Sequence, residues 1–250
     1  MVSQKPESYL FYSRATRRDL GRGPAVVGAW LVLLSSLVTA DPAQSSKGSE
    51  QAWQPLFDGK TLANWESTKF IGEGAVTVEN GQIILEPGRD LTGISWIGPE
   101  LPTTNYEIAL QAMRVQGSDF FAGVTFPVAD SFCSLILGGW GGTVVGLSSI
   151  NGMDASENET SQSVQFESGR WYNIRIRVTP EKIEAWLDER QIINQGLKGN
   201  KIDTRFEVRP SQPLGVASWR TKAALRDLRL RRLTPVAPNF SSASATVTRN

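Results

Sequence analysis

Residues 171–188 have the sequence WYNIRIRVTPEKIEAWLD, in which apolar residues occupy every second position of two short runs. Pro180 lies in the turn between the runs, where its fixed φ angle suits the second position of a type I turn. Alternation with a period of two on both sides of a tight turn predicts an antiparallel β-hairpin with one buried face. Trp186 falls on the polar face, where we expect Arg175 or Arg177 to stack on its indole ring.

The same alternation continues on both sides of this hairpin. Residues 76–85 repeat it around Asn80-Gly81, a dipeptide typical of a two-residue hairpin turn. The segment 223–230 fits a strand with a bulge near Asp227 better than a helical turn, because only a strand puts its last two leucines on one face. Two further runs place apolar residues on one parity: Tyr106, Ile108, Leu110 and Ala112 in the first, and Phe120, Ala122, Val124 and Phe126 in the second.

No long window of the chain has a helical apolar face, and short strands separated by turns recur throughout. This pattern predicts an all-β fold, an antiparallel β-sandwich or jelly roll rather than a parallel sheet. The roughly 180 residues between two polar segments suffice for one domain with a substantial core. We expect that domain at residues 53–233, with a linker at 41–52 and a disordered tail at 234–250.

The composition of the chain excludes several classes of protein. Its 250 residues include 26 Lys and Arg, 25 Asp and Glu, and no His. This balance leaves no basic excess, so we expect no nucleic-acid partner. The lack of His removes Ser–His–Asp catalysis, His-ligated zinc and His general bases. Cys133 is the single cysteine, which excludes an internal disulfide and a Cys-cluster metal site; we expect it to be buried as a small apolar residue.

The first 40 residues are similar to an export signal. A basic segment precedes an apolar run at 25–38, and Val38-Thr39-Ala40 offers a small-x-small cleavage site. The apolar run is shorter than the roughly 20 residues that a membrane-spanning helix needs, so an uncleaved anchor is the weaker alternative. Arg17-Arg18 also fits a twin-arginine signal. We therefore expect a signal peptide at 1–40, an exported protein in the periplasm or outside the cell, and no membrane-spanning segment once the signal is cleaved.

Three carboxylates cluster in one predicted loop, at Asp154, Glu157 and Glu159, with Asn158 among them. Such a loop can ligate a calcium ion or hold a carboxylic acid with a raised pKa. The alternative is a solvated acidic connector, since the ligand spacing of an EF-hand loop is absent. Asp58, in an Asp-Gly turn, is a second candidate calcium ligand, although an aspartate there often serves the turn alone. Calcium is the one cofactor that these positions suggest.

Two tryptophans are candidates for stacking on a ligand ring. Trp140 stands among four glycines, so the backbone there can approach a ligand closely. Trp219 precedes Arg220, whose guanidinium can donate to a ligand oxygen. Trp186 and Asn158 complete the candidate ligand-binding residues. The alternatives are a Trp140 folded onto the sheet, a core Trp219 and a solvated face around Trp186.

Four segments carry a resemblance to a known family. They are residues 56–62 with Trp65 (LFDGKTL…W), residues 78–83 (VENGQI), residues 169–174 continuing into 183–188 (GRWYNI…IEAWLD), and residues 225–230 (LRDLRL). In this order they resemble the 3-keto-disaccharide hydrolase-like family, whose members are also called 3-keto-glucoside lyases or 3-keto-2-hydroxy-glucal hydratases. The resemblance spans residues 53–233. It implies a concanavalin- or laminin-G-like jelly roll with a concave sheet that holds a sugar.

The chain departs from that family at functional positions. Ser131-Phe132-Cys133-Ser134-Leu135 stands where the family has Gly-Tyr-Glu-x-Gln, and the His near the last strand of the family is missing. The resemblance therefore implies the fold and a saccharide as partner, but it supplies no catalytic residue.

Two functions remain open at this point. The first is an exported enzyme that cleaves or hydrates 3-keto-glycosides. In this enzyme Asp154, Glu157 or Glu159 would act as acid or base, and Arg220 would stabilise the enolate that forms when the C2 proton next to the C3 carbonyl is removed. The second is a non-catalytic carbohydrate-binding module of the cell envelope, in which tryptophans stack on the sugar. Both need the tryptophans, Arg220 and the acidic loop to meet at one concavity.

Overall fold

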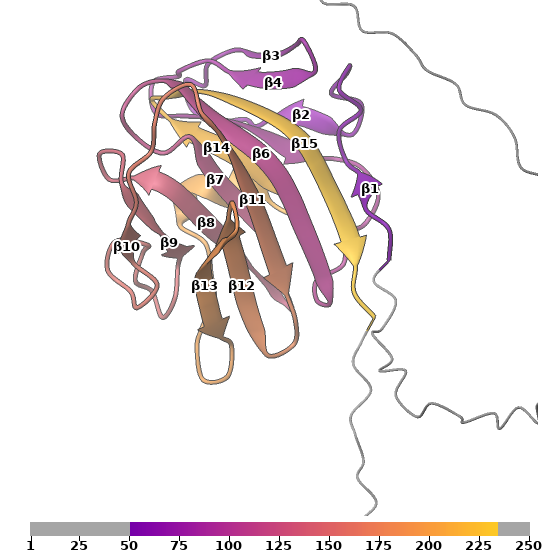
Figure 1. Cartoon of the computed structure of the whole chain (residues 1–250), viewed down its shortest axis with the longest axis vertical. Coiled ribbons are helices and arrows are strands. Elements are labelled where there is room, and N and C mark those ends of the chain that lie inside the picture. Colours follow the sequence, from indigo (N-terminus) through magenta and orange to yellow (C-terminus); the bar gives the residue numbers. More distant parts are fainter. Residues whose placement is uncertain (1–50, 235–250) are drawn as a thin grey trace, which may run out of the picture. The chain divides into compact units, whose positions relative to one another are not determined.

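The computed structural model describes residues 51–234, which form two antiparallel β-sheets packed against each other (Figure 1). This arrangement confirms the predicted all-β sandwich. The only helix among these residues is the 3₁₀-helix η1 (Phe206–Ser211). The predicted signal peptide at 1–40, most of the predicted linker and the tail after residue 234 lie outside the described residues. The described part of the chain contains no helix with the length and apolar character that crossing a bilayer requires.

The first sheet contains eight strands, and they come from both ends and the middle of the domain. They are β1 (Gln54–Pro55), β3 (Val76–Glu79), β4 (Gln82–Leu85), β6 (Tyr106–Gln116), β11 (Trp171–Val178), β12 (Lys182–Leu187), β13 (Arg190–Gly196) and β15 (Lys222–Arg232). Seven of them follow the spatial order β13-β12-β11-β6-β15-β4-β3, and β1 pairs with the later half of β15.

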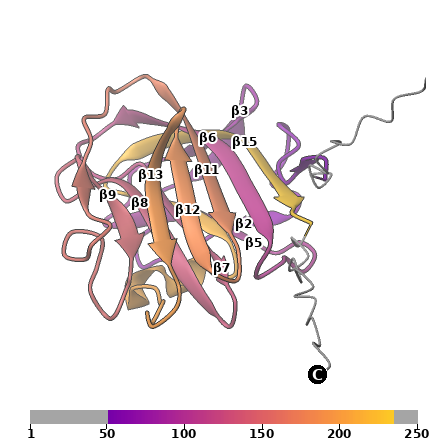
Figure 2. The same ribbon diagram turned by 60° about the horizontal axis from the view of Figure 1, so that its bottom comes forward.

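The second sheet contains seven strands and carries the site described below. They are β2 (Trp65–Ser67), β5 (Leu91–Trp96), β7 (Ala122–Val128), β8 (Ser131–Gly139), β9 (Val144–Ser148), β10 (Gln162–Ser163) and β14 (Gly215–Trp219). Their spatial order is β10-β9-β8-β7-β14-β5-β2. In Figure 2, strands β11 and β12 lie in one layer and strands β7 and β8 in the other.

The predicted hairpins are confirmed. Asn80 and Gly81 have φ angles of 51° and 78°, the left-handed values that the turn between β3 and β4 requires. Strands β11 and β12 pair in the predicted antiparallel register, and the Arg175 guanidinium lies 3.7 Å from the centre of the Trp186 ring. The pairing of β15 with β6 shifts register next to Asp227, so the predicted bulge is also present.

The core lies between the two sheets. It consists of the alternate apolar side chains that the sequence pattern predicted to face inward. Tyr106, Ile108 and Leu110 of the first sheet face Val124 and Leu135 of the second in one continuous cluster. Because alternate side chains of each strand point into this layer, the remaining side chains lie on the outer face of each sheet.

Cys133 is fully buried in the core cluster, as predicted. Burial raises the pKa of its thiol to about 12, since the low-dielectric surroundings disfavour the thiolate. A neutral thiol of this kind packs as a small apolar side chain and is a poor nucleophile.

The prediction that Phe120 shares the inward face of Ala122, Val124 and Phe126 is wrong. Phe121 supplies the core side chain before β7, and its ring lies 5.1 Å from Phe166 and 5.9 Å from Tyr172, measured between ring centres. Phe120 packs on the outer face of the second sheet, beside Trp219. The alternation holds within a strand, and Phe120 precedes the strand, in a turn where its amide donates to the carboxylate of Asp119.

The outer face of the second sheet consists mostly of small side chains. One row across five strands is Gly93, Ala217, Gly123, Ile136 and Gly146, and the next row is Ser95, Gly215, Thr125, Ser134 and Ser148. A Cβ atom at Gly215 would lie 2.7 Å from Ser211, so the lack of a side chain lets η1 lie directly on the sheet. The result is a low floor that neighbouring segments can wall in.

Candidate functional site

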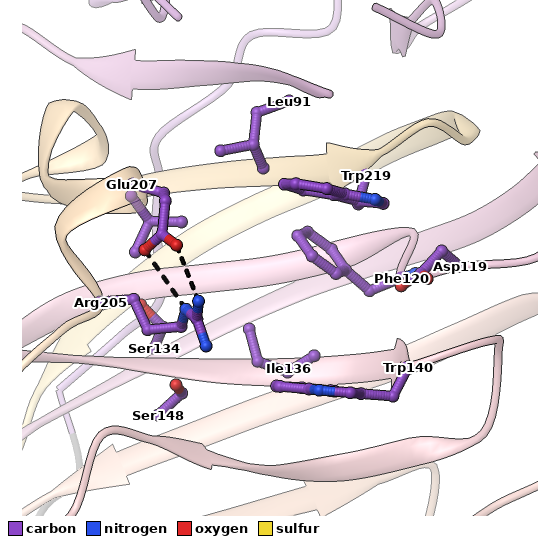
Figure 3. A pocket seen from close by; sticks show the side chains of 11 residues that line it. Leu91, Asp119, Phe120, Ser134, Ile136, Trp140, Ser148, Arg205, Glu207 and Trp219 are labelled. Carbon is purple, nitrogen blue, oxygen red and sulfur yellow. Dashed lines mark hydrogen bonds and ion pairs between the residues drawn. The ribbon is translucent and has the colours of Figure 1, made fainter. Parts of the chain in front are cut away.

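A cavity of about 280 Å³ opens on the outer face of the second sheet (Figure 3). Its floor comes from β8 and β9, its walls from β5, β14 and the loops before β7 and after β8, and one end from η1 and the residue preceding it. The lining residues are Leu91, Asp119, Phe120, Ser134, Ile136, Trp140, Ser148, Arg205, Glu207, Val208 and Trp219.

Tryptophans lie on two opposite sides of the cavity. Figure 3 shows Trp219 and Trp140 edge-on, with Phe120 and Ile136 between them. Phe120 packs on Trp219, with 6.4 Å between the ring centres, so these two rings form one aromatic wall. Trp140 is 44% exposed, and its indole is therefore open to a ligand.

The turn around Trp140 depends on its glycines. Gly142 has a φ angle of 114°, and a Cβ atom there would lie 2.7 Å from the carbonyl oxygen of Ser118. Only glycine fits that position. The Asp119 carboxylate accepts a hydrogen bond from the amide of Gly141, which ties the turn to the strand-entry loop that carries Phe120. The glycines thus hold Trp140 over the cavity.

The floor of the cavity contains a buried hydroxyl with nothing to bind. The hydroxyls of Ser134 and Thr125 hydrogen-bond each other at 2.9 Å. The neighbouring Ser148 is 1% exposed, and its Oγ has no hydrogen-bond partner within the described residues. Leaving a buried hydroxyl unpaired costs roughly 1–3 kcal/mol. A ligand oxygen in the cavity would supply the missing partner.

An ion pair closes one end of the cavity. Arg205 donates from Nη2 to Oε1 of Glu207 at 2.7 Å and from Nε to Oε2 at 3.2 Å (Figure 3). The hydrogen bond from Arg205 lowers the pKa of the Glu207 carboxyl, so this group is ionised at neutral pH. The Nη1 of Arg205 also donates to Asp154, 2.7 Å away. The cavity therefore has an aromatic half and a charged end.

The structure brings together Trp140 and Trp219, two of the residues singled out in the sequence, on this cavity. Arg220 follows Trp219 but does not line the cavity. Its guanidinium lies 5.4 Å from the centre of the Trp219 ring and donates to the Arg89 carbonyl and to Asp90. Trp186 lies on the first sheet, stacked against Arg175, whereas Trp219 is on the second sheet and Trp140 follows a strand of it.

The acidic loop lies beside the cavity rather than inside it. Asp154 reaches the cavity only through its ion pair with Arg205. Glu157 is exposed and lines a second, neighbouring cavity, and Glu159 is exposed and accepts a hydrogen bond from Gln195. Asn158 is buried, and its amide group donates to the carbonyl oxygens of three loop and strand residues, Leu147, Met153 and Asp154. Asn158 therefore shapes the loop and is not open to a ligand.

The structure gives no support to a calcium site at the predicted positions. The Asp58 carboxylate accepts hydrogen bonds from the amides of Lys60 and Thr61 and from the Thr61 hydroxyl. These bonds, led by the one from Thr61, lower the pKa of Asp58 and account for both of its oxygens. Within residues 51–234, no three acidic, Cys or His side chains gather as a metal site would require.

The sequence did not single out Ser148, Arg205 or Glu207. Arg205 and Glu207 flank an aromatic residue, and this alternation of charges around a ring is a weak signal of an exposed turn. Ser148 alternates with the core residue Leu147 on β9, so the sequence pattern places its side chain on the outer face of the sheet and predicts a surface position. No local pattern indicates which outward face becomes a floor, because its walls come from distant segments.

The two packed antiparallel sheets define the chain as a β-sandwich protein. Residues 52–231 match the 3-keto-alpha-glucoside-1,2-lyase-like domain, and the chain belongs to that family. This match confirms the resemblance that the four sequence segments carry. No curated protein matches the chain.

Solved structures with the same architecture are distant in sequence. Crh5 transglycosylase in complex with NAG is 11% identical, with 74% of this chain and 85% of that chain covered and a TM-score of 0.50. A structure from work on the endo-acting O-glycanases with which prominent human gut bacteria initiate mucin breakdown is 11% identical, covers 72% of this chain and 100% of its own, and has a TM-score of 0.50. The carbohydrate-binding module CBM66 from Bacillus subtilis is 14% identical over 67% of this chain and 95% of that chain, with a TM-score of 0.43. At these identities the two matches with a TM-score of 0.50 show the fold alone.

Proposed function

We propose that the cavity between Trp140 and Trp219 binds a saccharide. The observation that carries this proposal is the pairing of two accessible indoles on opposite walls with an unpartnered buried hydroxyl, Ser148, in the floor. Sugar rings present apolar C–H faces that stack on indoles and hydroxyls that need hydrogen-bond partners at their edges. Membership of a family named for a glucoside-cleaving domain agrees with this ligand class.

The charged end of the cavity suits sugar hydroxyls. Glu207 is held ionised by Arg205, and a carboxylate accepts strong hydrogen bonds from hydroxyl groups. Ser134 and Ser148 offer further donors and acceptors on the floor. The site therefore provides stacking on its sides and polar contacts below and at one end, which is the arrangement that orients a small polar ring.

Binding is better supported than catalysis, because both carboxylates that line the cavity already have hydrogen-bond partners. Both oxygens of Asp119 already accept backbone amides, from Phe120 and Gly141. The lowered pKa of Glu207 makes it a weak base. The acids first considered, Asp154, Glu157 and Glu159, do not line this cavity, and neither does Arg220.

The second candidate function is cleavage or hydration of 3-keto-glycosides, and membership of the family favours it. In that case Glu207 is the group placed to remove the C2 proton of the sugar, which the C3 carbonyl of the same sugar acidifies. Turnover of a 3-keto-disaccharide by the unmutated protein, lost on Glu207→Gln, would favour the enzyme. Binding of the same sugar without turnover would favour the binding module.

Calorimetric titration with neutral saccharides tests the binding proposal. We expect Trp140→Ala and Trp219→Ala each to weaken binding by about 1–3 kcal/mol, the range for a stacked aromatic at the centre of a site. Trp186→Ala is the matched control, because it removes a tryptophan of the opposite sheet. Equal affinity in the two cavity variants and the unmutated protein, or an equal loss in the control, would contradict the proposal.

We also propose that the protein is exported. The basic segment, the apolar run at 25–38 and the Val38-Thr39-Ala40 site support this proposal. Expression of the full chain and of a chain lacking residues 1–40, followed by cell fractionation and mass measurement, tests it. We expect the full chain outside the cytoplasm and shortened at Ala40, and the truncated chain inside.

A further inference from the structure

The outer face of the first sheet carries a regular array of arginines. Strands β12, β11, β6 and β15 lie side by side in this sheet (Figure 1). Their register places the outward side chains in three rows: Glu184, Arg177, Glu107 and Arg231 in the first, Trp186, Arg175, Ala109 and Arg229 in the second, and Asn173, Gln111 and Arg226 in the third. We call the five arginines of these rows the basic face. It points away from the cavity, which opens on the outer face of the other sheet.

The basic face has an excess of positive charge. Two glutamates, Glu107 and Glu184, stand in the same rows as the five arginines. Beside the rows, Lys182 and Asp227 add one charge of each sign. Among these described residues the cations therefore exceed the carboxylates by three, whereas over the whole chain 26 Lys and Arg almost balance 25 Asp and Glu. Because like charges repel at short range, an anionic partner would be stabilised at this face.

Every arginine of the basic face lies against a tryptophan ring. The pairs are Arg175 and Arg177 with Trp186, Arg226 with Trp171, and Arg229 and Arg231 with Trp53, at 3.7–5.4 Å between the guanidinium carbon and the ring centre. Stacking on a ring orients a guanidinium and leaves N–H donors at its edges for an anion. The side chains of Arg175, Arg177 and Arg229 are 32%, 29% and 41% exposed, so an anion can reach them.

The layout of the face favours a surface of phosphate groups as its partner. Strands β11 and β15 flank β6, so their arginines are about 10 Å apart across the strands, and successive rows are about 7 Å apart along them. The cations thus spread in two dimensions, as a sheet of headgroups requires, and do not follow a single line. Tryptophan together with Arg or Lys is also the composition typical of membrane interfaces.

The chain enters the fold at this same face. Trp53, which lies against Arg229 and Arg231, comes immediately before β1. The apolar run at 25–38 ends 15 positions before Trp53. In the export that we propose, this run meets the membrane first, and the basic face is the part of the fold that follows it most closely in the chain.

We infer that the basic face binds the anionic phospholipid headgroups of a membrane surface. Phosphate oxygens would accept hydrogen bonds from the edges of the stacked guanidiniums, an arrangement for which arginine is well suited. The three tryptophans would then lie at the level of the headgroups. A domain held in this way turns the cavity of the second sheet away from the bilayer. This inference does not depend on the proposed saccharide binding.

Co-sedimentation with vesicles tests the inference, with the protein in the form that is recovered after export. We expect binding to phosphatidylcholine vesicles that contain about one third phosphatidylglycerol, none to phosphatidylcholine alone, and release in about 1 M salt, where the Debye length is about 3 Å. Arg226→Gln and Arg229→Gln should each weaken binding by about fivefold, the loss expected for one cation at an anionic surface. Arg226 bonds Gln111 and Arg229 bonds Asp227, so both substitutions leave the hydrogen bonds of the buried Glu107 in place.

Asp227→Asn makes the opposite change in charge. It removes a carboxylate beside Arg229, and asparagine tolerates the left-handed φ angle of 56° at this position. Binding to the anionic vesicles should strengthen by about fivefold, a gain that a loss of folding cannot produce. Arg89→Gln is the matched control and should bind as the unmutated protein does, because Arg89 has a side chain that is 74% exposed and precedes β5 of the second sheet.

Equal binding to the two kinds of vesicle, or unchanged binding in both Arg226→Gln and Arg229→Gln, would overturn the inference. Binding to heparin without binding to the vesicles would also overturn it, since the face would then serve a soluble polyanion. Saccharide titration of the same variants should give the affinity of the unmutated protein. A failure of vesicle binding is thereby distinguished from a failure of the proposed function.

Discussion

The guanidinium of Arg205 lies 2.7 Å from the carboxylate of Asp154, although the two residues are 51 positions apart in the chain. The contact joins the segment that enters η1 to the acidic loop after β9. Since the same guanidinium also holds Glu207, the position of the charged end of the cavity depends on both carboxylates.

Asp154→Asn should uncouple the acidic loop from Arg205. The Oδ1 of Asp154 accepts from the amide and hydroxyl of Ser156, and an asparagine oxygen can keep these bonds. The Oδ2 that accepts from Arg205 becomes an NH₂ group, so the ion pair is lost. A double-mutant cycle with Arg205→Gln, measured by urea unfolding, should give a coupling energy of about 0.5–1 kcal/mol, because the arginine is partly exposed. Additive effects of the two substitutions would show that the contact does not hold η1 in place.

Ser148→Ala should separate stability from binding. Removing a buried hydroxyl that has no partner relieves its desolvation penalty, so we expect the free energy of unfolding to stay constant or rise. Saccharide affinity should fall by about 0.5–1.5 kcal/mol, the value of one hydrogen bond. Ser211→Ala is the control: Ser211 is also fully buried, its hydroxyl also has no partner within the described residues, and it lies outside the cavity lining. A clear loss of stability in Ser148→Ala without loss of affinity would remove Ser148 from the site.

The parts of the fold that the sequence predicted are those encoded over a few residues. The hairpin turn at Asn80-Gly81 and the bulge next to Asp227 depend on local backbone preferences and on alternation within one strand. Phe120 was placed on the wrong face because it lies just outside its strand, where alternation no longer applies.

The site was predicted only as far as single residues could indicate it. Trp140 and Trp219 stand out by their type and by their neighbours in the sequence. The contact between Arg205 and Asp154 depends on the positions of two segments that are far apart in the chain. The Ser148 hydroxyl lacks a partner because no neighbouring segment among the described residues places a donor or an acceptor next to it. Neither property is encoded in a short stretch of chain.

Glu107→Gln should destabilise the first sheet strongly. The side chain of Glu107 is fully buried, and it accepts hydrogen bonds from Arg175 at 2.8 Å, Arg177 at 2.7 Å and Arg231 at 2.6 Å. These arginines come from the two strands on either side of β6. Removing the one carboxylate that all three share weakens the compensation of three neighbouring positive charges, and we expect a loss of about 3 kcal/mol in urea unfolding. Glu184→Gln, on β12 of the same sheet, is the control and should cost less, because Glu184 bonds the partly exposed Lys182 at 2.8 Å and lies 4.0 Å from only one of the three arginines, Arg177.

The same carboxylate should make the stability of the protein fall in acid. Burial alone would raise the pKa of Glu107, but hydrogen bonds from Arg177 and Arg231 outweigh it and lower the pKa below its usual value of 4.5. The unfolded chain then binds a proton at a higher pH than the folded chain does. The stabilising contribution of Glu107 is therefore complete above about pH 4.5 and is lost as the pH falls through the lower pKa of the folded state. Urea unfolding of the unmutated protein and of Glu107→Gln between pH 7 and pH 3 should show two curves that converge as the pH falls, since only the unmutated protein has this contribution to lose. Curves that stay parallel over the whole range would mean that the three arginines do not hold Glu107 in its ionised form.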